Sequence, residues 1–190
     1  MAVVVVGGSR KDVGKTGLVC ATISALREFG WTAVKITGHD YGPAEQKSRA
    51  DALTREEESA GQDTDTARYL AAGARRALLM TRTGSDVPIE KIRQVIGSHR
   101  NVIFESNRVV DAVKPDVCLA LIGGHERKPS FERLMRAADA VLIVRGSGRE
   151  TPREGVRRFE LESVDRLPAE FVTWLRERLA GAVTPMSAGQ

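Results

Sequence analysis

Cysteine is scarce in this chain of 190 residues: only Cys20 and Cys118 occur, and their spacing fits no metal-binding pattern. Cys20 falls in a predicted helix and Cys118 in an apolar strand, so we interpret both as reduced core thiols. Long apolar runs are absent too. The opening run is too short for a secretory signal and lacks its basic flank, and nothing approaches a membrane span. These absences predict a cytoplasmic protein with no membrane partner.

Aromatic residues make up only 5% of the chain, and the net charge is a modest +4 with scattered arginines. A basic run with interleaved aromatics is typical of nucleic-acid binding, so we expect no nucleic-acid partner. Basic groups around a site for phosphate esters would explain the small positive charge equally well.

Short β-branched runs alternate with helical patterns along the chain. Strands are predicted at 3–6, 32–36, 76–80, 101–105, 116–121 and 140–144, and helices at 15–29, 66–72, 89–97, 131–138 (capped by Ser130) and 169–179. This order predicts an α/β fold of three layers with a mainly parallel, doubly wound sheet, whose ligands lie at the carboxyl ends of the strands. We expect a single domain over residues 1–180 and a flexible tail over residues 181–190.

The stretch VVVVGGSRKDVGKTG, residues 3–17, runs from a buried strand through a loop into a helix. A loop that wraps a polyphosphate needs inward N–H groups, a lysine for the terminal phosphates and a hydroxyl for Mg²⁺. Gly14, Lys15 and Thr16 meet that requirement, which predicts a site for GTP or ATP with Mg²⁺. The residues expected to contact the nucleotide are Gly8, Ser9, Arg10, Lys11, Asp12, Val13, Gly14, Lys15, Thr16 and Gly17, together with Lys35.

This phosphate loop is one residue longer than the usual motif, because five residues, SRKDV, separate Gly8 from Gly14. The longer loop resembles that of dethiobiotin synthetase, which belongs to a class of P-loop proteins that includes MinD-like ATPases. Members of the class often carry an extra loop cation. Arg10 or Lys11 could therefore neutralise phosphate, also across a dimer, or could face solvent. The resemblance makes a homodimer the expected assembly.

Further polar residues lie near the end of the second predicted strand and before the next helix. Lys35 could contact phosphate or simply leave the strand toward water. Asp40 and Asp65 could each hold Mg²⁺ directly or through water. Asp65 could instead be only the N-cap of the helix that follows it. Arg68 could bind phosphate or pair with a nearby carboxylate.

Two of these stretches, KITGHDY at 35–41 and DTARYLAAGA at 65–74, resemble motifs of the molybdopterin-guanine dinucleotide biosynthesis protein B family. The resemblance covers residues 2–145. It implies a P-loop NTPase that binds nucleotide and Mg²⁺, hydrolyses the nucleotide slowly and assists a biosynthetic enzyme of the molybdenum cofactor.

The segment NVIFESNR ends a predicted buried strand with Glu105, at the same sheet edge as Thr16. A carboxylate there could bind Mg²⁺ through water or orient the attacking water. We therefore expect Lys15 and Glu105 to be catalytic. The candidate metal ligands are Thr16, Asp40, Asp65 and Glu105.

The residues after Glu105 depart from the family pattern, in which glycine typically follows this glutamate. Ser106 and Asn107 could instead contact a different substrate or cap the next helix. The alternative function is therefore an ATP-dependent ligase or kinase of the dethiobiotin synthetase type that acts on a small molecule.

Two further stretches leave their roles open. The acidic, polar segment 45–65 could be a mobile lid, or a solvated helix or loop. The loop in LALIGGHERKPS, residues 119–130, could touch base, ribose or substrate, or be a plain surface turn. An Asn-Lys-x-Asp guanine signature is absent; the similar VKPD at 113–116 begins a strand and so lies at the wrong end of the sheet. The preferred base stays undecided.

Overall fold

The computed structural model describes residues 1–38, 54–61, 63–82, 88–147 and 152–183. Its strands are β1 (Ala2–Gly8), β2 (Thr32–Gly38), β3 (Thr54–Glu56), β4 (Arg76–Arg82), β5 (Asn101–Glu105), β6 (Val117–Ile122), β7 (Ala140–Val144) and β8 (Arg157–Leu161). Its helices are α1 (Lys15–Ala25), α2 (Asp65–Ala72), α3 (Ile89–Ser98), α4 (Pro129–Ala137) and α5 (Ala169–Val183), with short 3₁₀ turns η1 (Arg27–Phe29) and η3 (Val109–Asp111).

Within the described residues, eight strands form one sheet in the order β3-β4-β2-β5-β1-β6-β7-β8. Along this spatial order, every neighbouring pair from β4 through β2, β5, β1, β6 and β7 to β8 is parallel. Of the described strands, only β3 pairs antiparallel, with β4. In the register between β1 and β5, Val6 lies opposite Glu105. The phosphate loop and Glu105 therefore leave the sheet at the same edge.

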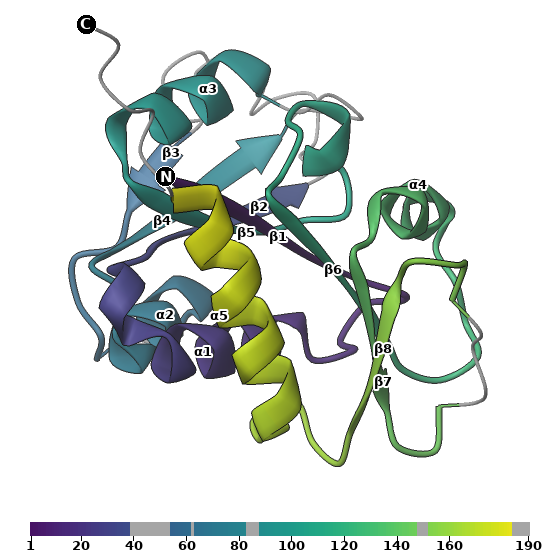
Figure 1. Ribbon diagram of the computed structural model, residues 1–190. Helices are drawn as coiled ribbons and strands as arrows, with labels where there is room; N and C mark the ends of the chain where they lie inside the picture. The colour runs from purple at the N-terminus through teal and green to yellow at the C-terminus, as the bar shows by residue number, and fades with distance from the viewer. Residues whose placement is uncertain (39–53, 62, 83–87, 148–151, 184–190) are drawn as a thin grey trace, which may run out of the picture.

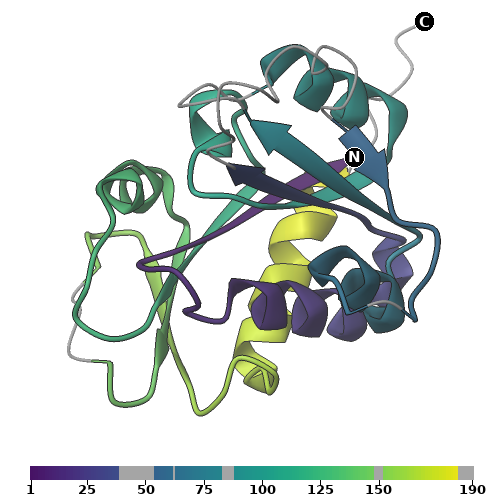
Figure 2. The same ribbon diagram turned by 180° about the vertical axis from the view of Figure 1, so that it is seen from behind.

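Helices cover both faces of the sheet (Figures 1 and 2): α1, α2 and α5 lie on one face, and α3 and α4 on the other. Successive side chains of β1 point to opposite faces of the sheet, so this one strand packs against both helix layers. Val4 and Val6 pack with α1 and α5, whereas Val3 and Val5 pack with α3 and α4. The predicted three-layer α/β fold with a mainly parallel, doubly wound sheet is confirmed.

The two outer strands were not predicted. β8 alternates, with Arg158 and Glu160 exposed and Phe159 and Leu161 buried, so its charged side hides the strand signal. β3 falls inside the segment expected to be a lid or a solvated helix or loop. Thr54–Glu56 instead forms an edge strand, and the N–H of Glu57 continues the pairing by donating to Ala77 O (2.9 Å). Residues 45–53 lie outside the described residues.

Helix ends differ from the expected ones in local ways. The first helix stops at Ala25 and continues as the turn η1, which Gly30 closes with φ 61°. Ser130 does not cap α4, because Pro129 already occupies the first turn and Lys128 holds the N-cap position. The helix α5 runs to Val183, four residues past its expected end.

Both thiols are free. Cys118 is buried in β6, and burial raises its pKa to about 12; burial raises the pKa of the half-buried Cys20 to about 11. Both values are far above neutral pH, so the thiolate forms are scarce.

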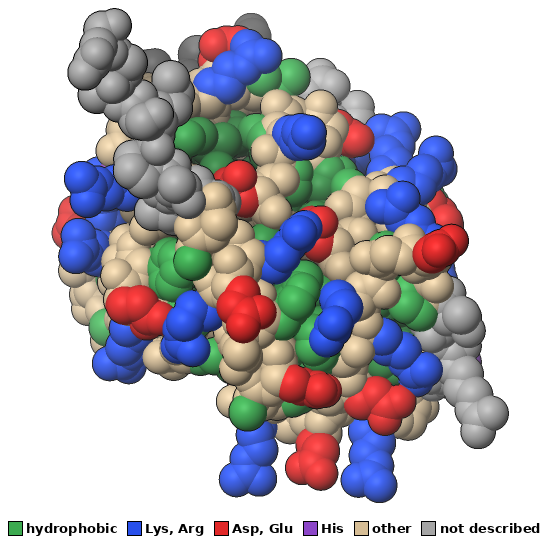
Figure 3. Space-filling view, in the orientation of Figure 1, with side chains coloured by type: hydrophobic (Ala, Val, Ile, Leu, Met, Phe, Trp, Pro, Cys, Tyr) green, Lys and Arg blue, Asp and Glu red, His purple; other side chains and the backbone are tan. Residues whose placement is uncertain are grey.

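No helix among the described residues combines the length and apolar character that crossing a bilayer requires. On the face that α5 covers, Lys and Arg side chains are interleaved with Asp and Glu (Figure 3). Mixed signs of this kind weaken the local electrostatic potential.

Candidate functional site

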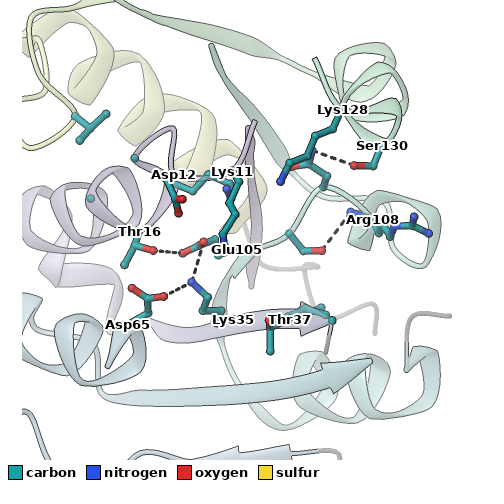
Figure 4. Close-up of a pocket in the computed structure, with 18 of the residues that line it drawn as sticks. Lys11, Asp12, Thr16, Lys35, Thr37, Asp65, Glu105, Arg108, Lys128 and Ser130 are labelled. Carbon is teal, nitrogen blue, oxygen red and sulfur yellow. Dashed lines mark hydrogen bonds and ion pairs between the residues drawn. The ribbon is translucent and has the colours of Figure 1, made fainter. Parts of the chain in front are cut away.

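A cavity of about 580 Å³ opens at the carboxyl edge of the sheet (Figure 4). The phosphate loop, the ends of β2 and β5, the start of α2 and the segments 128–130 and 164–165 form its walls. Ligands of doubly wound sheets bind at this edge. The volume falls in the usual range for small-molecule sites.

The phosphate loop enters α1 through two residues with positive φ, Asp12 at 57° and Gly14 at 100°. Glycine is needed at the second position for another reason also, since a Cβ there would lie 2.8 Å from Val164 Cγ1. Within the described residues, no side chain caps α1, and its first turn contains no acidic residue. The free N–H groups and the positive end of the helix dipole at Lys15 therefore favour an anion.

The predicted nucleotide contacts divide into two groups. Those that line the cavity are Lys11, Asp12, Gly14, Lys15, Thr16, Gly17 and Lys35. Those that lie outside its lining are Gly8, Ser9, Arg10 and Val13. Ser9 and Val13 are buried, and the Arg10 Nε donates to Gly123 O (3.2 Å). The residues of the second group therefore support the phosphate loop on the side that faces away from the cavity.

Glu105 is the centre of the polar network in the cavity. Its Oε2 accepts hydrogen bonds from Thr16 Oγ1 (2.8 Å) and from the phenol of Tyr69, and its Oε1 accepts from Lys35 Nζ (3.3 Å). Lys35 also pairs with Asp65. The Glu105 side chain is 5% exposed, so this carboxylate depends on these donors for its solvation.

The pKa values in the cavity follow from burial and from these neighbours. Burial lowers the pKa of Lys15; Glu105 opposes the shift and Lys128 adds to it. Burial alone would lower the pKa of Lys35, but Glu105 and Asp65 raise it overall. For Asp65, burial is outweighed by the hydrogen bond and charge of Lys35, and the pKa falls. The positive charge of the half-buried Lys15 is thus one that a bound anion would stabilise.

Asp65 is the first residue of α2 and does not cap it. The cap is Thr64, whose side chain accepts from the N–H of Ala67 (3.0 Å). Asp65 instead lines the cavity, where it pairs with Lys35. Its Oδ1 lies 3.7 Å from Arg68 Nη1. The proposed cap role of Asp65 is therefore wrong.

The carboxylates of Asp65 and Glu105 converge on one ammonium group, that of Lys35, beside the hydroxyl of Thr16. Mg²⁺ is usually held by one or two carboxylates together with waters and phosphates, so this donor set fits the ion. Among the described residues, no group of three or more His, Cys, Asp or Glu could bind a metal by itself. Asp40 lies outside the described residues.

Asn107 has a structural task that the sequence did not reveal. Its side chain accepts from Gly8 N (2.7 Å) and donates to Gly8 O (2.9 Å), so it holds the start of the phosphate loop. Its Nδ2 also donates to Ser130 Oγ (3.3 Å). Ser106 Oγ accepts from the N–H of Arg108 (3.2 Å), and no side chain caps η3. The alternative that these residues cap the next helix is therefore wrong. Both residues line the cavity, and their contact with a substrate stays a prediction.

Sequence reasoning missed two features of this site. Tyr69 lies four residues after Asp65 on α2, a spacing that places both side chains on one helix face and could have identified it. Val164 and Asp165, by contrast, follow the unpredicted strand β8 and reach the first turn of α1 from far along the chain. No local signal identifies them.

The chain was compared with known proteins. No protein-family model matches it, and no curated protein does. Among solved structures, HypB from Helicobacter pylori in complex with nickel matches with a TM-score of 0.55 and 12% identity, over 98% of this chain and 91% of that chain. At this identity the match concerns the fold alone. Together with the strand order, it supports the three-layer α/β fold with a mainly parallel sheet.

Proposed function

We propose that this protein binds GTP or ATP with Mg²⁺ in the cavity and hydrolyses the nucleotide slowly. One observation carries the proposal: Lys15 and Thr16 stand at the uncapped amino end of α1, and the buried carboxylate of Glu105 accepts from Thr16. This arrangement supplies a lysine, helix N–H groups and a metal-binding hydroxyl in the order that a triphosphate requires.

The chain's own residues provide mainly binding and electrostatic stabilisation. The Lys15 ammonium and the first N–H groups of α1 would bind the phosphate oxygens and stabilise the charge that develops on them. Thr16, Asp65 and Glu105 would hold Mg²⁺ directly or through water. The bound ion would neutralise charge on the terminal phosphates.

Slow hydrolysis follows from how fully Glu105 is occupied. Thr16, Tyr69 and Lys35 all donate to its carboxylate. Three donors already share its two oxygens, so a water must compete with them for the remaining acceptor site before Glu105 can orient it for attack. This competition is consistent with weak intrinsic turnover.

We propose an accessory role in molybdenum cofactor biosynthesis, on the strength of the two motif resemblances at 35–41 and 65–74.

The second candidate is a ligase or kinase that acts on a small molecule. It is supported by the part of the cavity lined by Thr37, Arg108 and Ser130, beyond the phosphate loop. Turnover that rises only with a partner enzyme favours the first role, and turnover that one small molecule stimulates stoichiometrically favours the second. The homodimer and the cytoplasmic location stay predictions.

Calorimetric titration with GTP and ATP, with and without Mg²⁺, tests the binding function. Lys15→Ala removes a charge-assisted contact worth about 2–3 kcal/mol, which weakens triphosphate binding roughly 30- to 150-fold. Lys114→Ala is the matched control, because Lys114 is exposed and lies at the amino end of β6, away from the cavity. Equal affinity in wild type and Lys15→Ala would contradict the proposed function.

A further inference from the structure

The loop between β6 and α4, residues 123–128, is fastened to the phosphate loop through Ser9. The N–H of Ser9 donates to Leu121 O (2.9 Å), its hydroxyl donates to Gly123 O (3.2 Å), and its carbonyl accepts from the N–H of Lys128 (2.8 Å). A Cβ on Gly123 would lie 2.6 Å from Val13 Cγ2, so the two loops are in close contact. The backbone of Lys128 is thereby fixed relative to the phosphate loop.

The side chain of Lys128 extends into the cavity, across from Thr16 and Asp65 (Figure 4). No ion pair of Lys128 occurs within the described ranges. Its charge also lowers the pKa of Lys15, so the two ammonium groups repel each other. Two lysines that face one cavity from two connected loops form a favourable site only for an anion between them.

The two ends of the phosphate loop give this anion site a direction. Val164 lies against the end of the loop at Gly14 and the first turn of α1 at Gly17, where an added Cβ would meet it at 2.8 Å, whereas the first part of the loop, at Ser9, bonds the N–H of Lys128. A polyphosphate that follows the loop therefore runs from an apolar side chain toward a lysine. The nucleoside suits the end at Val164, and the most charged group suits the end at Lys128.

We propose that Lys128 contacts the terminal phosphate of the bound triphosphate, opposite Lys15, and makes the site discriminate triphosphate from diphosphate. This inference rests on the proposed nucleotide-binding function. The inference gives the segment IGGHERK a role. Its paired glycines allow close packing on the phosphate loop, and Lys128 contacts a phosphate that only the triphosphate has.

The test is calorimetric titration of Lys128→Met with the triphosphate and diphosphate of the same nucleoside, in the presence of Mg²⁺. The substitution keeps the backbone N–H that bonds Ser9, and a thermal melt checks that the variant is folded. We expect triphosphate affinity to fall about tenfold. Diphosphate affinity should change less than about twofold, because the diphosphate lacks the contacted group. Lys128→Arg should retain most of the preference, and Lys114→Met should match wild type.

Two outcomes would overturn the inference while leaving the proposed function intact. One is unchanged triphosphate affinity in Lys128→Met. The other is an equal loss for triphosphate and diphosphate, which would mean that Lys128 acts on the inner phosphates or through the loop. Failure of wild type to bind either nucleotide would instead overturn the proposed function and this inference together.

Discussion

Replacing Lys35 with methionine should destabilise the ligand-free protein. Lys35 is the shared partner of Asp65 and Glu105, so Lys35→Met leaves these two carboxylates without their common cation, and of their ion pairs within the described residues only that of Asp65 with Arg68 (3.7 Å) remains. Breaking a fully buried pair costs about 3–5 kcal/mol. Here Glu105 is 5% exposed, Lys35 21% and Asp65 36%, so solvent screens part of the loss. We expect Lys35→Met to lower the free energy of unfolding by about 2 kcal/mol. In a chain of this size, that loss lowers Tm by about 4–8 °C.

The pH dependence of this loss gives the sharper test. The pKa of Asp65 is lowered in the folded protein, so its pairing stabilises the fold above the ordinary carboxyl pKa and is lost as pH falls through the lowered value. The pKa of Lys35 is raised, so its share is present below the ordinary lysine pKa and is lost as pH rises through the raised value. The difference in Tm between wild type and Lys35→Met should therefore be widest between about pH 4 and pH 10 and narrow in acid.

Thermal unfolding monitored by circular dichroism from pH 3 to pH 8 measures this difference, with Lys114→Met as the control for loss of an exposed lysine. Added Mg²⁺ should restore part of the lost stability in Lys35→Met, because the ion can take the place of the ammonium between the carboxylates. Equal melting temperatures at neutral pH, or a difference that does not narrow in acid, would refute the reasoning.

The remaining predictions concern Thr16 and Glu105. Thr16→Ala removes a hydroxyl placed to bind Mg²⁺, so titrations should show nucleotide affinity that no longer responds to the ion; metal-stimulated binding in this variant would count against the assignment. Glu105→Gln keeps the shape of the side chain but removes its charge. Single-turnover assays should therefore show hydrolysis slowed at least about tenfold while binding changes only a few-fold, and equal losses would argue against a role in the chemical step.

The centre of the fold could be predicted because its signals are local. β1 has no polar side chain and β5 is apolar over Val102–Phe104, as strands buried on both faces must be, and the Gly-Lys-Thr sequence that opens α1 marks the end of the phosphate loop. Because β1 and β5 were expected to be parallel, their carboxyl ends had to lie at the same edge of the sheet. This alone predicted that Glu105 lies at the same edge as Thr16. Their contact in the structure agrees with that expectation.

The parts that escaped prediction depend on contacts between distant segments. β8 carries charge on its open side, and β3 is a three-residue edge strand inside an acidic stretch, so neither has a strong pattern of its own. The two hydrogen bonds between Asn107 and Gly8 join residues 99 positions apart, and only the folded chain reveals them. Ser130 misled for a different reason, since the proline before it begins the helix two positions earlier than expected.

A crystal structure with Mg²⁺ and a non-hydrolysable triphosphate analogue tests the central claim most directly. The account predicts phosphate density at the amino end of α1, with oxygens within hydrogen-bond distance of the ammonium of Lys15 and a metal ion beside the hydroxyl of Thr16. An analogue bound elsewhere, or a cavity that stays filled by the ion pairs of Lys35 at saturating analogue, would contradict it.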